Sequence, residues 1–232
     1  MAAMGQDREA DRIRDYFERQ HPEWHRWPRA RAFIVEERRR LLWKAGRLAE
    51  RAGNELTVCD VGCGDGSDLA FWRSQGVKEE RLAGTELIPS RGAVARRRLP
   101  LAQIADVDGT SLPFADNQFA LTSASLVLSV IREDDARAVL FSEMWRITRP
   151  GGVVAVYDFR VKRPENDQVV ALTGRRIAAL GHPLAYRWLA APFLPVLDML
   201  LALPWPIPAV SVVLPRTHAV WIWCKRYPPT TT

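Results

Sequence analysis

Leu-Thr-Val-Cys-Asp-Val-Gly-Cys-Gly-Asp-Gly, at residues 56–66, is the stretch that decides the fold. An apolar run typical of a β-strand ends at Asp60, and a turn with three alternating glycines follows at once: Gly62, Gly64 and Gly66. Glycine has no Cβ, so such a turn can reverse sharply and expose backbone N–H groups to a ligand. Residues 67–73 have helical spacing, and a helix N-terminus attracts negative charge. The stretch therefore predicts the ligand-binding corner of a doubly wound α/β sheet.

The glycine spacing and the charges of this turn argue against phosphate-rich ligands. The dinucleotide fingerprint G-x-G-x-x-G would need a glycine at position 67, where the chain has Ser67. No Gly-Lys-Ser/Thr follows the glycines, as a P-loop requires. Asp60 and Asp65 would repel a pyrophosphate, but they suit a ligand with one cationic amino group and a single carboxylate. The turn favours a nucleoside that carries an amino-acid tail.

Polar residues follow the next two expected strands. Residues 82–87 read as the second strand, and Glu86 at its end can accept hydrogen bonds from both ribose hydroxyls. Residues 106–114 end the third strand. There Asp108 can accept a hydrogen bond from an exocyclic adenine amine, and the Gly109 N–H can donate to the ring. These positions are consistent with a nucleoside across the strand ends.

Two more segments complete an ordered pattern. Residues 119–128 read as a buried fourth strand that reaches the same cleft. Residues 144–159 join a helix to a fifth strand through an Arg-Pro-Gly-Gly turn. In this order the segments resemble the class I S-adenosylmethionine-dependent methyltransferases of the small-molecule type, over roughly residues 56–160.

The resemblance implies S-adenosylmethionine as the methyl donor and a set of cofactor-binding residues. These are Asp60, Gly62, Cys63 and Gly64 for the methionine part, Glu86 for the ribose with Leu87 beside it, Asp108 and Gly109 for the adenine, and Ser123 near the sulfonium. The chain departs from the family pattern at Ala120, where an aspartate is common, and at Ser129, where a histidine is often found. The second departure removes one base, so a non-catalytic protein that binds the cofactor stays open.

The expected fold is a seven-stranded Rossmann-like sheet, mostly parallel with an antiparallel final strand, in one domain of 232 residues. A helical cap (1–52) precedes the cofactor core (53–160). An insertion at 161–217 is expected to form a substrate lid or a homodimer contact, and 218–232 hold the last strand and the tail. The apolar stretch 192–214 is interrupted by prolines and Asp198, which argues against a membrane-spanning helix.

The net charge of +6 raises the question of nucleic acid. The arginine run at 38–40 has the spacing of a solvated helix face, and the run at 96–98 is expected to close a helix. No RNA-binding motif is visible, so we expect no nucleic-acid partner. Three cysteines show neither disulfide nor metal spacing, and the N-terminus lacks a signal peptide; we expect a cytoplasmic protein without a metal site.

The acceptor and the catalytic base are the least determined parts. Asp158, at the end of the fifth strand, is the first candidate for a base, followed by His182 and His21; a structural hydrogen bond is the alternative role for Asp158. Nine tryptophans, four of them outside the core motifs, suggest O-methylation of a saccharide hydroxyl. C-methylation of a quinone or prenyl-type, lipid-linked metabolite is the alternative, favoured by the apolar insertion. A nicotinamide oxidoreductase is the remaining rival class.

Overall fold

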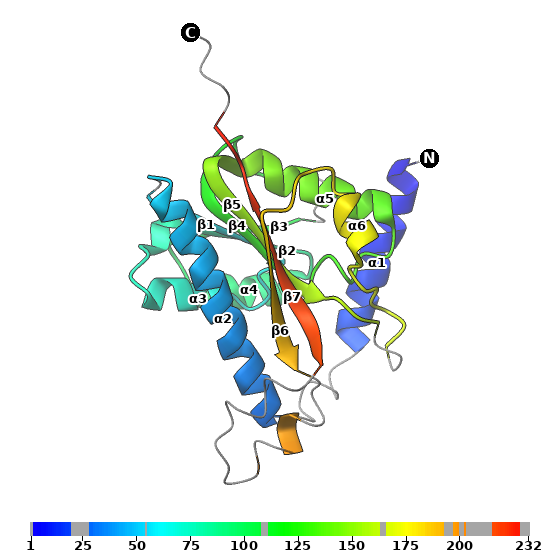
Figure 1. The fold of residues 1–232 in the computed structure, drawn as a ribbon. Coiled ribbons are helices and arrows are strands. Elements are labelled where there is room, and N and C mark those ends of the chain that lie inside the picture. The colour runs from blue at the N-terminus through cyan, green and yellow to red at the C-terminus, as the bar shows by residue number, and fades with distance from the viewer. Residues whose placement is uncertain are drawn as a thin grey trace.

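The computed structural model describes residues 2–19, 28–53, 55–107, 111–162, 166–192, 197–199, 202 and 215–227. Within these ranges a seven-stranded sheet has the order β3-β2-β1-β4-β5-β7-β6 (Figure 1). The strands are β1 (Val58–Val61), β2 (Leu82–Glu86), β3 (Gln103–Asp106), β4 (Phe119–Ser125), β5 (Thr148–Phe159), β6 (Tyr186–Pro192) and β7 (Arg216–Cys224). The helices are α1 (Ala2–Arg19), α2 (Pro28–Arg51), α3 (Ser67–Ser74), α4 (Pro89–Arg98), α5 (Asp134–Ile147) and α6 (Gly174–Ala178), with one 3-10 turn, η2 (Glu79–Arg81).

The strand directions confirm the predicted fold class. Strands β1 to β5 pair in parallel, whereas β7 runs antiparallel to both β5 and β6. The order reverses between β1 and β4, because β1 pairs with β2 on one side and with β4 on the other. In open α/β sheets this reversal creates a crevice at the carboxyl ends of the strands, where ligands bind. The glycine turn directly after β1 lies at that crevice.

Alternation along the strands divides the interior into two cores. Side chains such as Val58, Leu121 and Tyr157 face α2, α3 and α4, while Cys59 and Val156 face α5 and α6. Figure 1 shows α2 and α3 on one side of the sheet, and α5, α6 and α1 on the other. Because β1, β4 and β5 are covered on both faces, their residues are buried almost throughout, as expected for central parallel strands.

The sequence also located several boundaries. The arginine run at 96–98 ends helix α4, as predicted. The expected short strand near 186–190 is β6, and the final strand is β7. Among the described residues no helix has both the length and the apolar character needed to cross a membrane. Residues 161–217 lie partly outside the described ranges. Their predicted role as a lid or a dimer contact therefore stays a prediction.

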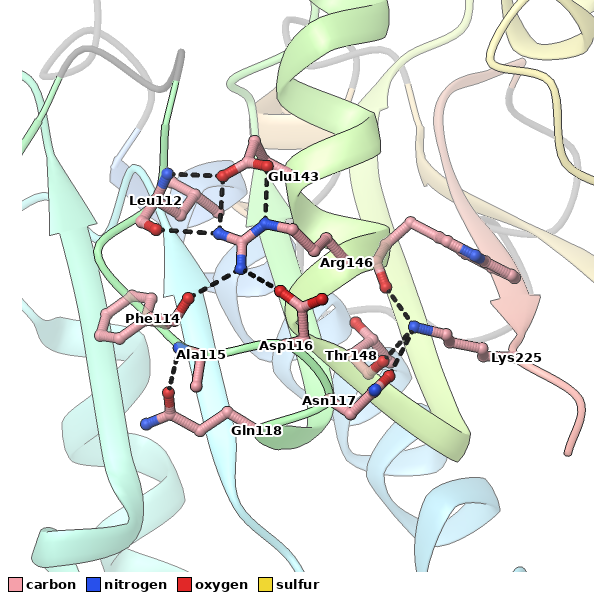
Figure 2. Close-up of polar contacts among 11 residues, drawn as sticks. Leu112, Phe114, Ala115, Asp116, Asn117, Gln118, Glu143, Arg146, Thr148 and Lys225 are labelled. Carbon is pink, nitrogen blue, oxygen red and sulfur yellow. Dashed lines mark hydrogen bonds and ion pairs between the residues drawn. The ribbon is translucent and has the colours of Figure 1, made fainter. Parts of the chain in front are cut away.

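Arg146 of α5 fixes the loop that leads into β4, at the edge of the sheet opposite the glycine turn (Figure 2). Its guanidinium donates to the carbonyl oxygens of Leu112 at 2.9 Å and Phe114 at 2.8 Å. It also pairs with the carboxylates of Asp116 and Glu143, both at 2.7 Å. Glu143 in turn accepts a hydrogen bond from the Leu112 N–H at 2.8 Å. One side chain thus holds residues 112–116 of the loop to α5.

Lys225, which follows β7, closes the same edge (Figure 2). Its ammonium donates to the carbonyl oxygens of Trp145 at 2.8 Å and Thr148 at 2.6 Å, and to Asn117 Oδ1 at 2.9 Å. All three ammonium donors are therefore used, two of them at the C-terminal end of α5, where the helix dipole favours a cation. Burial lowers the pKa of Lys225.

Candidate functional site

The turn after β1 has a backbone that only glycine adopts readily. Gly62, Gly64 and Gly66 have φ of +72°, +59° and +76°, which lie in the left-handed region. A Cβ at Gly62 would overlap a Val127 methyl group, and one at Gly64 would lie 2.7 Å from the end of the Arg91 side chain. The turn therefore needs glycine for its conformation and, at Gly62, for the close approach of its neighbour.

Glu86 is buried at the end of β2 and is held against this turn. Its Oε2 accepts a hydrogen bond from the Gly64 N–H at 2.7 Å, and its Oε1 accepts one from the Ile88 N–H at 3.0 Å. Each carboxylate oxygen has a second lone pair that these bonds do not use. The carboxylate is thus fixed in orientation while it can still accept hydrogen bonds from a diol.

Asp60 and Ser123 form a buried pair between β1 and β4. The Ser123 hydroxyl donates to Asp60 Oδ1 at 2.7 Å, and the two residues are register partners. Burial, and then the negative charge of Asp68, raise the pKa of Asp60 to about 7. A cationic group placed beside Asp60 would reverse this shift, because it stabilises the ionised form. The position therefore suits an ammonium group.

The other predicted cofactor residues differ in what the structure shows. The Cys63 side chain lies over Gly84 of β2, since a Cβ at Gly84 would be 2.8 Å from its Sγ, so only the backbone of Cys63 belongs to the turn. Leu87 is half-buried directly after Glu86. Asp108 and Gly109 lie outside the described residues.

Of the three predicted catalytic residues, Asp158 and His182 are described, and they lie apart. Asp158 is fully buried; it accepts hydrogen bonds from the Ser129 N–H and the Phe159 N–H, at 2.9 and 2.8 Å. Burial raises the pKa of Asp158 to about 6. The bond from the Ser129 N–H ties β5 to the loop after β4, and this is the structural role considered as the alternative.

The two histidines give no further support for a base. His182 stacks on Trp145 with ring centroids 3.9 Å apart, and its carbonyl accepts from Trp223 Nε1. Trp145 lies in the last turn of α5, just before the start of β5, so His182 lies toward the edge of the sheet away from the glycine turn. This position does not support His182 as a base. His21 lies outside the described residues.

The prediction that residues 38–40 form a solvated face is wrong for two of the three arginines. Arg38 pairs with Asp68, in the first turn of α3, at 2.8 Å, and its side chain is only 13% exposed. Arg39 reaches the same carboxylate at 3.2 Å and donates to the Ser67 carbonyl at 3.0 Å. Arg40 is exposed. Helix α2 therefore brings two cations to the glycine turn, a feature without a local sequence signal because the partner is about 30 residues away.

An apolar cluster lies at the carboxyl ends of β4 and β5, beneath α1. Its buried members are Val130, Phe159 and Val169, with Ile13, Tyr16, Phe17 and Leu126 packed against them. The helix is tied to the loop after β4, since Glu9 accepts a hydrogen bond from the Arg132 N–H at 2.6 Å. The guanidinium of Arg91, which borders Gly64, lies 5.1 Å from the ring centroid of Phe17. Helix α1 thus approaches the glycine turn through an apolar surface.

Comparisons with known proteins point to the family that the sequence pattern resembles. The family described as "Methyltransferase domain" matches residues 59–156. The chain is 34% identical over 114 residues to the ubiquinone/menaquinone biosynthesis C-methyltransferase of Bdellovibrio bacteriovorus, covering 47% of this chain and 46% of that protein. It is 31% identical over 104 residues to the malonyl-[acyl-carrier protein] O-methyltransferase of Pectobacterium atrosepticum, covering 45% and 39%. The chain thus spans less than half the length of these two curated relatives.

A solved structure shares the fold at low identity. Geranyl diphosphate C-methyltransferase from Streptomyces coelicolor A3(2) superimposes with a TM-score of 0.56 and 14% identity, over 79% of this chain and 77% of that one. At this identity the likeness establishes the fold alone.

The residues around the turn fit the cofactor of this family. The backbone of the turn disfavours side chains at Gly62 and Gly64, Glu86 presents a fixed carboxylate, and Asp60 suits an ammonium group. The family match runs without interruption from β1 through the glycine turn and into β5. Residues 59–156 thus resemble a methyltransferase domain, and the fold and the turn agree with the class I S-adenosylmethionine-dependent type, whose methyl donor is S-adenosylmethionine.

Proposed function

We propose that the chain transfers a methyl group from S-adenosylmethionine to a small hydrophobic metabolite, with a carbon atom of a quinone-type ring as the acceptor. The observation that carries this proposal is the apolar cluster beneath α1, which borders the carboxyl ends of β4 and β5. Apolar walls with few polar groups are typical of pockets for hydrophobic small molecules. The similarity to the quinone C-methyltransferase of Bdellovibrio bacteriovorus supports the same acceptor class.

The predicted binding roles belong to this proposal. Glu86 accepts hydrogen bonds from the ribose hydroxyls, Asp60 faces the amino group of the tail, and the backbone of 62–64 lies against the methionine part. Ser123, which was predicted to lie near the sulfonium, also donates a hydrogen bond to the Asp60 carboxylate at 2.7 Å and orients it. Asp108 and Gly109 keep their predicted role at the adenine.

The cofactor supplies an activated methyl group on a sulfonium, so the protein has to align the acceptor with it and exclude water. Alignment of two reactants can lower a barrier by several kcal/mol, in order of magnitude. Helix α1, anchored by Glu9 to the Arg132 N–H, covers the strand ends and restricts access of water there. Asp158 holds the loop after β4 through the Ser129 N–H and acts as a positioning residue.

The tryptophans behind the saccharide prediction are mostly outside the described residues. Of the four tryptophans outside the core motifs, Trp188 is described: it is half-buried on β6 and packs against the core that faces α2. Trp24, Trp27 and Trp205 lie outside the described residues. Neither relative described above is named for a saccharide acceptor. Saccharide O-methylation stays an untested prediction.

A second candidate is O-methylation of a carboxyl group on an acyl thioester. The similarity to the malonyl-[acyl-carrier protein] O-methyltransferase of Pectobacterium atrosepticum favours it. The two arginines that α2 brings to the turn, Arg38 and Arg39, offer positive charge for such an acceptor.

Two measurements test the proposal. S-adenosylhomocysteine binding by calorimetry is expected for the wild type and at least tenfold weaker for Glu86→Gln, since a charged acceptor is lost. Glu79→Gln is the matched control, because Glu79 pairs with Arg73 on the far side of α3. Product formation is then measured with demethylated quinols, a malonyl thioester and sugars. Binding without turnover on any of them would indicate a non-catalytic cofactor-binding protein.

A further inference from the structure

A cavity of about 830 Å³ lies between α6 and the edge of the sheet formed by β7 and β6. We call this space the α6 cavity. Apolar and basic side chains line it together: Leu172, Ile177, Leu184, Trp221, Arg160 and Arg187. Pockets that bind small molecules have volumes of about 300–1000 Å³, so the α6 cavity has room for an organic molecule and is too large to be filled by a single ion.

Trp221 of β7 brings a hydrogen-bond donor to the α6 cavity that no described residue uses. The residue is only 3% exposed, and it lines the cavity. The indole N–H of Trp223, two residues further along the strand, donates to the His182 carbonyl at 3.2 Å. The N–H of Trp221 makes no such bond to a described residue. Because a buried tryptophan N–H usually has a partner, this donor points to an acceptor oxygen inside the cavity.

Two guanidinium groups line the α6 cavity without a carboxylate partner among the described residues. Arg187 of β6 is the register partner of Trp221, so the two side chains are on the same face of the sheet. Arg160, which follows β5, donates to the Arg216 carbonyl at 2.7 Å. No described Asp or Glu lines the cavity, so its described lining carries a positive charge.

The lining selects a ligand with a charged part and an apolar part. Opposite residues of antiparallel strands have Cβ atoms about 4.5–5.5 Å apart, so one carboxylate can accept from the Trp221 N–H and pair with the Arg187 guanidinium. Leu184 is 39% exposed, and an apolar group that covers it removes apolar surface from water. Free phosphate or sulfate would match the charge and leave the apolar wall in water.

The α6 cavity is separate from the cofactor crevice. The crevice lies where the strand order reverses between β1 and β4, whereas Trp221 is on β7, which β5 separates from β4. From β1 to β7 there are three strand spacings, about 14 Å. A ligand of the α6 cavity therefore does not displace the cofactor.

We propose that the α6 cavity is a second ligand site, which binds a small carboxylate with an apolar ring. The carboxylate pairs with Arg187 and accepts the Trp221 N–H, and the ring lies against Leu172, Ile177 and Leu184. The site is independent of the methyl transfer proposed above.

Calorimetric titration of the full chain with 2-naphthoate tests the site. A dissociation constant of about 1 mM or lower is expected for a ligand of this size. Neutral 2-naphthamide has the same ring and should bind about tenfold more weakly. Arg187→Gln and Trp221→Phe are each expected to weaken 2-naphthoate binding about tenfold, because each removes a donor to a charged group. Arg175→Gln is the matched control, since Arg175 is exposed on α6 outside the cavity.

A second titration uses protein saturated with S-adenosylhomocysteine, and the same affinity for 2-naphthoate is expected. Loss of binding there would place 2-naphthoate in the cofactor crevice and overturn the inference. It is also overturned if the wild type does not bind 2-naphthoate, if 2-naphthamide binds equally well, or if Arg187→Gln has no more effect than Arg175→Gln. The Trp221 N–H would then be bound by water only.

Failure of the proposed function gives a different result. If the wild type does not bind S-adenosylhomocysteine, the proposed function is contradicted, and the titrations of the variants with 2-naphthoate alone then decide on the α6 cavity. Circular dichroism confirms that each variant is folded. Arg187→Gln changes an exposed side chain, so the test does not depend on the stability of the Trp221→Phe variant.

Discussion

The Ser123 hydroxyl lies 2.7 Å from the Asp60 carboxylate, and both residues are buried between β1 and β4. The pKa of Asp60 is raised to about 7, so at pH 6 the carboxyl group is largely protonated. An ammonium group binds the ionised form. We therefore expect the affinity for S-adenosylhomocysteine to rise with pH up to about 7 and to level off above it, by roughly tenfold per pH unit below 7.

The stability of the free protein changes in the opposite direction. Because the folded pKa of Asp60 is raised, its contribution to the free energy of unfolding is largest below pH 4 and decreases as the pH rises through about 7. Calorimetric titration with S-adenosylhomocysteine between pH 5.5 and 8.5 measures how the affinity depends on pH. Asp60→Asn should flatten the profile, whereas Asp158→Asn should leave it intact, although burial also raises the pKa of Asp158. A profile that keeps its slope in Asp60→Asn would show that another group titrates.

Gly62→Ala is expected to abolish cofactor binding and to destabilise the fold. The left-handed backbone costs a non-glycine residue about 1–2 kcal/mol, and the overlap of the new Cβ with the Val127 methyl group adds about 1–3 kcal/mol. Urea unfolding and S-adenosylhomocysteine titration measure the two effects.

Gly76→Ala is the matched control for that substitution. Gly76 has φ of +91°, and a Cβ there would meet no atom within 4 Å, so it should show only the backbone cost, about 1–2 kcal/mol, and normal binding. Equal losses in the two variants would mean that the crowding by Val127 is relieved by a small shift.

The sequence predicted the parts of the site that depend on neighbouring residues. The turn after β1 and the end of α4 follow from local glycine and arginine patterns, and Glu86 ends β2 as expected. The orientation of Arg38 could not be predicted in this way, because its partner Asp68 is set by the packing of α2 on α3. Likewise, a carboxyl group at the end of β5 looks the same in sequence whether it faces a substrate or, as Asp158 does, a backbone N–H.

Arg146 should stabilise the fold with little effect on the chemistry. Arg146→Met removes hydrogen bonds to the carbonyl oxygens of Leu112 and Phe114, together with two ion pairs. The side chain is 30% exposed, so we expect a loss of about 1–2 kcal/mol in the free energy of unfolding. Arg47→Met, which breaks one exposed pair with Glu50, should cost less than about 0.5 kcal/mol. If both variants unfold at the same urea concentration, the Arg146 network contributes nothing beyond a surface ion pair.

Asp198 caps helix α2 from a distant part of the chain. Its Oδ1 accepts hydrogen bonds from the N–H groups of Arg29 at 3.1 Å and Ala30 at 2.9 Å, across 168 residues in the second case. A lost N-cap typically costs about 1 kcal/mol, so Asp198→Ala should lower the free energy of unfolding by about that amount. It should also speed hydrogen exchange in the first turn of α2. Asp198→Asn keeps an acceptor oxygen and should retain most of the stability, because a neutral amide caps a helix nearly as well as a carboxylate. If the Asp198→Asn variant were as unstable as the alanine variant, the negative charge at the helix N-terminus, and not the hydrogen bonds, would be the main contribution.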